Sequence, residues 1–398
     1  MKKKVLIASF DLEIGGVERS LISLLENFDY ESYDVDLFLY RQQGEFLELL
    51  PRKVNLVKEI PQYTTIRKTI REVLQERRWL LGGSRIIAKV AAQALGKIKR
   101  AREPGHYQMQ LMWKLALPLL PSLEERYDLA ISFLWPHYFV AEKVKAKKKI
   151  AWIHTDYSNV DTNRTADVKM WNRFDHIVSV SEACKDSFVR TYRVLNNKVE
   201  VIENITSPEF VRKMAVEHPP SPMSEDDRFK IVTVARLSHA KGIDKAVEAL
   251  KLLKGKGYDI AWYVVGYGGE EGAIRTLIER HRLERDFILL GKKTNPYPYI
   301  READLYVQPS RYEGKAVTVL EAQILSKPVL ITNYPTAPSQ VKNGIDGHIS
   351  ELSAHGLAEG IERLYLDSNY RERLTQACKA SDYGNSTREL QKLYRLIT

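Results

Sequence analysis

The chain has 398 residues, of which 44% are apolar and 28% charged, and its formal net charge is +10. This length suggests two domains of ordinary size, and this composition excludes a largely disordered protein. No apolar run approaches the roughly 18 residues of a membrane-spanning helix, so we expect no transmembrane segment.

The chain begins with three lysines and a short apolar run at 5–10, which an acid follows at once. This run is too short for a secretory signal, so we interpret it as a first β-strand. The two cysteines, Cys184 and Cys378, stand far apart and outside any metal-ligand spacing. We therefore expect free thiols in a reducing compartment and a cytoplasmic protein.

Strand-like runs of Val, Ile, Leu and Tyr alternate with helix-like segments along the whole chain. Such runs are typical of strands that are buried on both faces, as in parallel sheets covered by helices. The predicted strands lie at 3–9, 34–40, 53–58, 127–133, 148–153, 175–180, 199–203, 229–235, 260–266, 286–290, 303–307 and 328–332. The pattern appears twice and predicts an α/β protein with two doubly wound, Rossmann-like domains.

The alternation is interrupted at 65–125 by a helical insertion. Between positions 67 and 102 it carries eleven Lys and Arg residues against only Glu72 and Glu76, and the run "KVKAKKK" at 143–149 adds to this charge. Clustered charge suggests a negatively charged partner. One hypothesis places the insertion on an anionic membrane surface, and the other is an ordinary solvated helix pair. We predict no nucleic-acid partner, because no recognised binding module is present.

The segment 207–228 contains four prolines and a charge cluster, and it shows no period. We interpret it as a linker between a first domain at 1–206 and a second at 229–383. The final segment, 384–398, is helical in pattern. It either ends the second domain or returns to the first, and both placements stay open.

Ligands of open α/β sheets bind outside the carboxyl ends of the strands, so the loops after the strands are the candidate sites. Gly15 and Gly16 follow the first strand and precede a helix, where glycine lets a ligand approach the backbone and a helix start favours an anion. A plain tight turn explains them equally well. Gly266 and Gly268 follow the strand at 260–266 and allow a close turn beside a base or ribose.

Two cations follow the strand at 229–235 in "VARLSHAKGID". Arg236 can grip two phosphate oxygens in a fork and Lys241 supplies a point charge, so both suit a diphosphate. His154 and Asp156 follow another strand end in "AWIHTDYSN". His154 is a candidate donor to a sugar hydroxyl, although a lone histidine is more often simply packed.

The stretch "EGKAVTVLE" carries two glutamates, Glu313 and Glu321, around the predicted start of a helix. The backbone N–H groups of Gly314, Lys315, Ala316 and Val317 make an anion site there. The Glu313 carboxylate would be repelled by a phosphate beside it. This repulsion is tolerated if the carboxylate points past the phosphate to a neutral polyol. Glu321, which we place about two turns into the helix, suits the hydroxyls of a ribose.

Taken together, these motifs resemble the retaining GT-B glycosyltransferases of family 4. "EGKAVTVLEA" is similar to the family signature in which seven residues separate two glutamates, and "ARLSHAKGID" is similar to the segment that holds the donor diphosphate. "GGVERS", "IHTD", "VIEN" and "VVGYGGEE" follow in the expected order. Lys315 departs from the family, which often has Phe there, and adds a cation near the phosphates or the acceptor.

The resemblance implies that the two domains face a cleft, with the first binding the acceptor and the second the nucleotide sugar. It implies that Glu313 contacts a hydroxyl of the donor sugar, Glu321 the ribose, and Arg236 with Lys241 the diphosphate. His154 would then lie near the donor sugar.

By the same resemblance Gly16 would lie near the phosphates and the acceptor. We assign Gly15 and Asp156 to the acceptor side, and Gly266 and Gly268 to the loop on the base side.

We therefore predict a retaining hexosyltransferase that moves a hexose or N-acetylhexosamine from a nucleotide diphosphate sugar to a sugar acceptor, in surface or capsular polysaccharide synthesis. UDP is the default nucleotide and a lipid-linked sugar is one candidate acceptor. No Asp-x-Asp motif stands at a useful strand end, so we expect the cations and the helix start to stabilise the leaving group without a metal or other cofactor. The enzyme would be cytoplasmic, with the inner face of the membrane as an optional peripheral contact.

Three other classes stay in view. A glycosidase also uses paired carboxylates, but it would not need Arg236 and Lys241 beside them. A nucleotide-sugar epimerase of the same fold would bind the same donor and transfer nothing to an acceptor. A non-catalytic partner subunit is disfavoured, because the set of cations and glutamates is complete.

Overall fold

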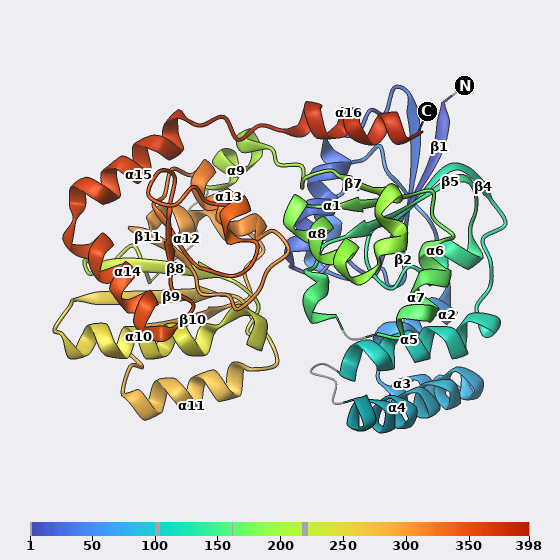
Figure 1. The fold of residues 1–398 in the computed structure, drawn as a ribbon, viewed down its shortest axis with the longest axis horizontal. Helices are drawn as coiled ribbons and strands as arrows, with labels where there is room; N and C mark the ends of the chain where they lie inside the picture. Colours follow the sequence, from blue (N-terminus) through green and yellow to red (C-terminus); the bar gives the residue numbers. More distant parts are fainter. Residues whose placement is uncertain (1, 100–103, 161, 217–221, 398) are drawn as a thin grey trace. The chain divides into compact units, whose positions relative to one another are not determined.

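The computed structural model describes residues 2–99, 104–160, 162–216 and 222–397 (Figure 1). The chain divides into two compact units. The first comprises Met1–Glu13, Val17–Ile205 and Thr387–Thr398, and the second comprises Ile14–Gly16 and Thr206–Ser386.

The first unit is built on a parallel sheet in which seven strands are found among the described residues, in the order β3-β2-β1-β4-β5-β6-β7. The strands are β1 (Lys3–Ser9), β2 (Tyr33–Leu39), β3 (Asn55–Leu56), β4 (Arg126–Ser132), β5 (Lys145–Ile153), β6 (His176–Ser179) and β7 (Val199–Val201). The strand order reverses between β1 and β4, which makes this point the usual ligand-binding position of such a sheet.

The helices of the first unit are α1 (Gly16–Glu26), α2 (Pro61–Thr64), α3 (Ile70–Gln75), α4 (Trp79–Lys99), α5 (Pro104–Ala116), α6 (Tyr138–Lys143), α7 (Arg164–Trp171), α8 (Glu182–Thr191) and α16 (Ser386–Ile397). Short 3-10 turns are η1 (Glu45–Leu49), η2 (Thr65–Arg67), η3 (Leu117–Leu119), η4 (Tyr157–Asn159) and η5 (Arg193–Lys198). The basic insertion thus consists of α3, α4 and α5 with flanking turns.

The last helix, α16, packs on the first unit although it follows the second in sequence. The carboxylate of Glu389 accepts a hydrogen bond from the Glu203 N–H at 2.9 Å. The Tyr394 hydroxyl accepts one from the Asp29 N–H at 2.7 Å, and its ring stacks on Tyr33.

The second unit is also built on a parallel sheet, in which the described residues form six strands in the order β10-β9-β8-β11-β12-β13. The strands are β8 (Phe229–Val234), β9 (Ile260–Val265), β10 (Phe287–Gly291), β11 (Leu305–Gln308), β12 (Val329–Thr332) and β13 (His348–Ser350). Here the order reverses between β8 and β11, so the loops after these two strands start side by side.

The helices of the second unit are α9 (Pro208–Met214), α10 (Ile243–Gly255), α11 (Glu271–His281), α12 (Tyr297–Glu302), α13 (Val317–Ile324), α14 (Ala354–Leu366) and α15 (Ser368–Ala380), with 3-10 turns η6 (His239–Lys241) and η7 (Ala337–Ser339). Successive strand residues face opposite helical layers. Trp262 and Val264 of β9 pack with α10, α11 and α14, whereas Tyr263 and Val265 pack with α9, α12 and α13. This two-sided burial confirms the predicted α/β architecture with two parallel sheets.

Two elements differ from the sequence prediction. Strand β13 was not predicted, because His348–Ser350 contains a single Val, Ile, Leu or Tyr residue and so lacks the apolar run that marks the other strands. The segment 207–228, which we interpreted as a linker because it shows no period, contains α9. Val211 of α9 and Met223 beyond it are buried in the core of the second unit. Apolar burial therefore orders part of a segment that looked irregular because of its prolines.

Candidate functional site

Two loops meet where the second sheet reverses its strand order. One follows β8 and runs to Gly242 at the start of α10, and the other follows β11 and runs to the start of α13. The Arg311 N–H donates to the Ala240 carbonyl at 2.7 Å. Gly242 has φ +65°, and a side-chain carbon there would lie 2.1 Å from the Pro309 carbonyl oxygen. Glycine therefore lets the two loops pack in direct backbone contact.

A salt bridge that the sequence analysis missed joins the same loops. Arg311 donates to an Asp244 carboxylate oxygen at 2.7 Å and to the His239 carbonyl at 2.8 Å. Burial acts to raise the pKa of Asp244, but the hydrogen bonds and charge of Arg311 outweigh it and lower that pKa. Neither Arg311 nor Asp244 belongs to a recognised sequence motif. The only available signal was that each residue follows closely after the end of a predicted strand.

Glu313 lies in the middle of this arrangement, and only 8% of it is exposed. Its carboxylate accepts hydrogen bonds from Lys241 Nζ at 2.6 and 2.7 Å, from the Ser310 hydroxyl at 2.6 Å and from Gln308 Nε2 at 3.2 Å. We assigned Lys241 to a diphosphate and Glu313 to a sugar. The structure brings them together as an ion pair, so each already has a partner of opposite charge.

Glu321 lies in α13 and is 3% exposed. The Tyr297 hydroxyl, from α12, donates to its Oε1 at 2.6 Å. The sequence analysis placed Glu321 about two turns into the helix. Because α13 begins at Val317, Glu321 is only about one turn inside it, with roughly 6 Å of rise. The carboxylate is thus nearer the helix start than predicted.

Most of the other residues assigned to the diphosphate follow the same two strands, β8 and β11. Arg236 follows β8 and is exposed, whereas Gly314 and Ala316, which caps α13, are buried. Lys315 and the first helical residue, Val317, are partly exposed. These five residues follow β8 or β11, at the carboxyl edge of the second sheet, whereas Gly16 follows β1.

The glycines after β9 have a packing function that the sequence did not reveal. A side-chain carbon at Gly266, which has φ +153°, would lie 1.8 Å from the Ala235 carbonyl oxygen. One at Gly268 would lie 2.3 Å from the Leu237 carbonyl oxygen. Both glycines therefore allow the loop after β9 to rest on the loop that carries Arg236. Their contact with a base stays a prediction.

His154 follows the end of β5 in the first unit. Its ring centroid lies 4.7 Å from that of Phe133, and the ring stacks on Trp152. Its Nε2 is buried without a hydrogen-bond partner in the described structure. Burial lowers the pKa of His154 to about 3, so the imidazole is neutral at physiological pH. It is suited to hydrogen bonding rather than to carrying charge.

A second buried histidine lies near His154 and was missed. His137 follows β4, and its Nδ1 lies 2.8 Å from the Ser132 hydroxyl. Burial, with a smaller contribution from the charge of His154, lowers the pKa of His137 to about 3. The triplet "WPH" after a strand end was the available signal.

The remaining predicted site residues of the first half of the chain are Asp156, Gly15 and Gly16, and each follows a strand of the first sheet. Asp156 is 3% exposed and its Oδ1 accepts the Ser158 N–H at 2.9 Å, so it caps the turn η4. Gly15 lies in the loop after β1, and Gly16 is the first residue of α1. A side-chain carbon at Gly16 would have nothing within 4 Å. Space beside Gly16 agrees with a ligand approach, which stays a prediction.

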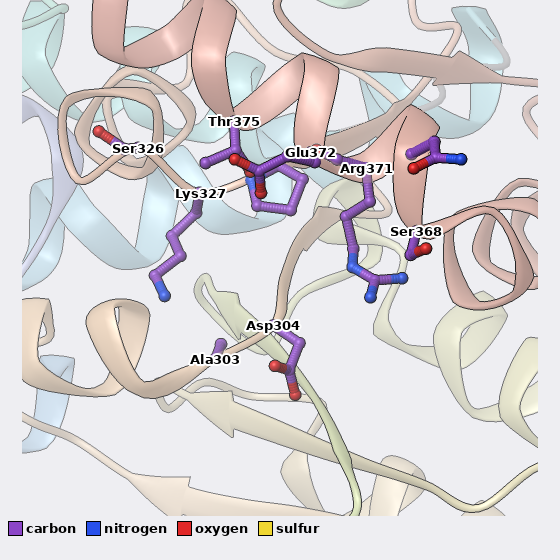
Figure 2. Close-up of a pocket in the computed structure, with 10 residues that line it drawn as sticks. Ala303, Asp304, Ser326, Lys327, Ser368, Arg371, Glu372 and Thr375 are labelled. Carbon is purple, nitrogen blue, oxygen red and sulfur yellow. The ribbon is translucent and has the colours of Figure 1, made fainter.

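A surface pocket lies at the opposite edge of the second sheet, beside the starts of β11 and β12 (Figure 2). Its lining includes Asp304, Lys327, Arg371 and Glu372. It contains none of the predicted site residues. Among the described residues there is also no group of His, Cys, Asp or Glu side chains that could hold a metal ion.

Known families match most of this chain. Residues 14–210 match the model described as Glycosyltransferase Family 4, and residues 217–381 match the model described as Glycosyl transferases group 1. The chain belongs to this family of glycosyltransferases.

Curated relatives match over shorter stretches. The capsular polysaccharide biosynthesis glycosyltransferase CapM of Staphylococcus aureus is 27% identical over 214 residues, which are 50% of this chain and 54% of CapM. The amylovoran biosynthesis glycosyltransferase AmsK of Erwinia amylovora is 31% identical over 145 residues, 34% of this chain and 36% of AmsK. The matched region thus spans about half or less of the length of these relatives.

Solved structures match over the whole chain. Anabaena Alr3699/HepE in complex with UDP-glucose is similar with a TM-score of 0.70 at 18% identity, covering 99% of this chain and 98% of that one. TarM is similar with a TM-score of 0.66 at 14% identity, covering 100% and 99%. At these identities the likeness concerns the fold, and the predicted GT-B fold is confirmed.

Proposed function

We propose that the protein is a retaining hexosyltransferase that transfers a hexose or N-acetylhexosamine from a UDP-sugar to a sugar acceptor. The observation that carries this proposal is that Arg236, Lys241, Glu313 and Glu321 all follow β8 or β11, where the second sheet reverses its strand order, and that Lys241 and Glu313 are paired at 2.6 Å. Family membership supports it, as does the structural likeness to a protein that was solved with UDP-glucose. We assign donor binding to 229–383 and acceptor binding to 1–206.

In this proposal Arg236, Lys241 and the start of α13 hold the diphosphate, with Gly16 near it. Glu321 accepts the ribose hydroxyls and Glu313 a hydroxyl of the sugar. The bond between the sugar carbon and the diphosphate oxygen breaks, and a bond to the acceptor oxygen forms on the same face. The departing phosphate oxygen takes the acceptor's proton, so no protein base is needed.

Lys241 has a further part in this scheme. It already neutralises Glu313 at 2.6 Å, so it can lie between the sugar-binding carboxylate and the diphosphate and reduce their repulsion. We propose that His154, neutral because of its burial, exchanges hydrogen bonds with a sugar hydroxyl. Gly15 and Asp156 stay assigned to the acceptor side, and Gly266 and Gly268 to the base side.

The relatives named for capsular polysaccharide and amylovoran synthesis support an acceptor in surface polysaccharide assembly. A lipid-linked sugar in the cytoplasmic leaflet is the acceptor that we propose. We also propose that transfer proceeds without a metal, because cations and helix N–H groups can stabilise the leaving diphosphate. Activity that a chelator abolishes and magnesium restores would contradict this.

The test is a thermal-shift screen of UDP-glucose, UDP-galactose, UDP-GlcNAc and GDP-mannose, followed by assay of UDP release with and without acceptor. A bound donor at a hundredfold of its Kd stabilises the protein by about 2.7 kcal/mol. We expect one UDP-sugar to stabilise it and to release UDP only when an acceptor is present. Conversion of UDP-GlcNAc without any acceptor would indicate an epimerase instead.

The substitution Glu313→Ala tests the sugar contact. We expect kcat/KM to fall about 10²-fold, because the sugar loses its orientation, while binding of free UDP changes little. Glu359→Ala, at an exposed position of α14, is the control. Equal loss of UDP binding and sugar discrimination would show that Glu313 does not contact the sugar.

A further inference from the structure

Helix α4 carries apolar side chains on two opposite sides. Leu81, Ala88 and Ala92 are buried, with Ser84 in the same row, and attach the helix to the first unit. The other side exposes five large apolar residues, namely Leu80 (73% exposed), Trp79 (65%), Val90 (62%), Ile87 (60%) and Ile86 (44%). We call these five residues the α4 face. A helix that is apolar all round normally lies in a core or against lipid, and this one packs on one side only.

The surroundings of the α4 face are cationic. Arg77 precedes the helix and Lys89 lies on it, and both are exposed. Of the two acids in the segment 67–102, Glu76 is already paired with Lys68 at 2.6 Å. The sequence of α4 contains no acidic residue, so Arg77 and Lys89 leave an excess of positive charge beside the exposed apolar side chains. This combination is typical of helices that lie in the interface of anionic membranes.

Both ends of the insertion are hydrogen-bonded to segments that follow strands of the first sheet. Arg67 Nε donates to the buried Asp11, just after β1, at 2.7 Å. Gln110 of α5 donates to Asp167 at 2.7 Å and accepts from the Asn163 N–H at 2.9 Å, in the segment after His154. Helix α5 packs along α4 (Figure 1). The α4 face therefore has a set position relative to the acceptor-side loops.

We propose that the α4 face docks into the headgroup region of an anionic phospholipid bilayer. Its five apolar side chains enter the boundary with the acyl chains, and Arg77 and Lys89 lie among the lipid phosphates. A second copy of the chain fits the α4 face less well, because pairing two such helices would bring two strongly basic segments together. The inference rests on the proposed function for its biological sense, since docking would present the acceptor loops to a lipid-linked sugar.

The experiment is sedimentation of the full-length protein with vesicles of mixed phosphatidylglycerol and phosphatidylcholine, and with vesicles of phosphatidylcholine alone. We expect binding to the mixed vesicles that weakens as salt increases, because salt screens the lipid charge. The triple variant W79S/L80S/I87S should lose about a hundredfold in partition coefficient, because three apolar side chains no longer enter the bilayer. All three positions are exposed, so circular dichroism should show unchanged folding.

A matched control removes three equally exposed apolar residues elsewhere, in the variant V194S/I345S/L366S. These residues are 72%, 60% and 64% exposed, and the variant should bind the vesicles as the wild type does. The proposal fails if the wild type does not bind mixed vesicles, or if both triple variants bind equally. It also fails if sedimentation velocity shows a wild-type dimer that only W79S/L80S/I87S converts to a monomer.

The outcome is separable from that of the proposed function, because vesicle binding is measured without any sugar. UDP release with a water-soluble acceptor should be the same for the wild type and W79S/L80S/I87S. Vesicle binding without UDP-sugar turnover would leave docking in place and overturn the transferase proposal. Turnover without vesicle binding would overturn the docking proposal and leave the transferase proposal in place.

Discussion

At the residue scale, the Lys241–Glu313 pair changes how the proposed donor site works. Glu313 is buried and also accepts from Ser310 and Gln308, so three side chains converge on one carboxylate. A buried carboxylate that loses its cation keeps the cost of desolvation without compensation. Lys241 therefore stabilises the fold in addition to its proposed binding of the diphosphate. The sequence analysis gave Lys241 only the second of these two roles.

This coupling is testable with a double-mutant cycle. Lys241→Met should destabilise the protein by about 1–3 kcal/mol, because it leaves the Glu313 charge buried and unpaired. Adding Glu313→Gln in the same chain should restore part of that stability, since the buried charge is gone. Denaturant titration measures both effects, and Lys251→Met, at an exposed position of α10, is the control. Additive effects of the two substitutions would show that the pair is not coupled.

At the element scale, the proposed donor site depends on loops that rest on one another. The loop after β9 contacts the loop after β8 through Gly266 and Gly268, and Gly242 lets the loop after β11 approach. Arg311 then ties two of these loops through Asp244. The glycines therefore act by holding the loop with Arg236 and Lys241 in place, before any ligand is considered.

Substitution of two glycines separates packing from ligand approach. Gly266→Ala should lower the free energy of unfolding by about 1–3 kcal/mol, because it combines a disfavoured backbone angle with a clash against Ala235. Gly16→Ala meets nothing within 4 Å and should leave stability nearly unchanged. Thermal denaturation of both variants is the measurement. A stable Gly266→Ala protein would mean that this loop moves away at little cost.

At the scale of the whole molecule, the chain returns to its first unit after completing the second. Helix α16 buries Leu393 completely and places Glu389 where it accepts the Glu203 N–H. The first unit is thus completed by a segment that lies far along the sequence, since Glu203 and Glu389 are separated by 186 residues. Its stability is therefore linked to both ends of the chain.

A core substitution in α16 tests this dependence. Leu393→Ala should destabilise the first unit by about 2–5 kcal/mol, as other large-to-small substitutions in cores do. Gln391→Ala is exposed on the same helix and should change stability by less than about 0.5 kcal/mol. Hydrogen exchange of β1 and β8 can show which unit opens. Equal opening of both strands in Leu393→Ala would contradict a specific role in the first unit.

No described helix has both the length and the apolarity to cross a bilayer. The membrane contact that we propose uses the α4 face. The sequence indicated this region through its charge. It did not indicate which side of α4 is exposed, because apolar residues occur around the whole helix and only packing on α3 and α5 selects the buried side.

The sequence alone determined the architecture of this protein and where its candidate residues stand along the chain. Runs of β-branched residues mark strands that are buried on both faces, and the motifs follow the ends of those strands. Only the tertiary structure decided that Lys241 pairs with Glu313, that Tyr297 reaches Glu321, that Gly266 supports a neighbouring loop, and that β13 and α9 complete the second unit. Local patterns carry periodicity and turn chemistry, whereas these contacts join residues that are distant in sequence and meet only after the sheet has formed.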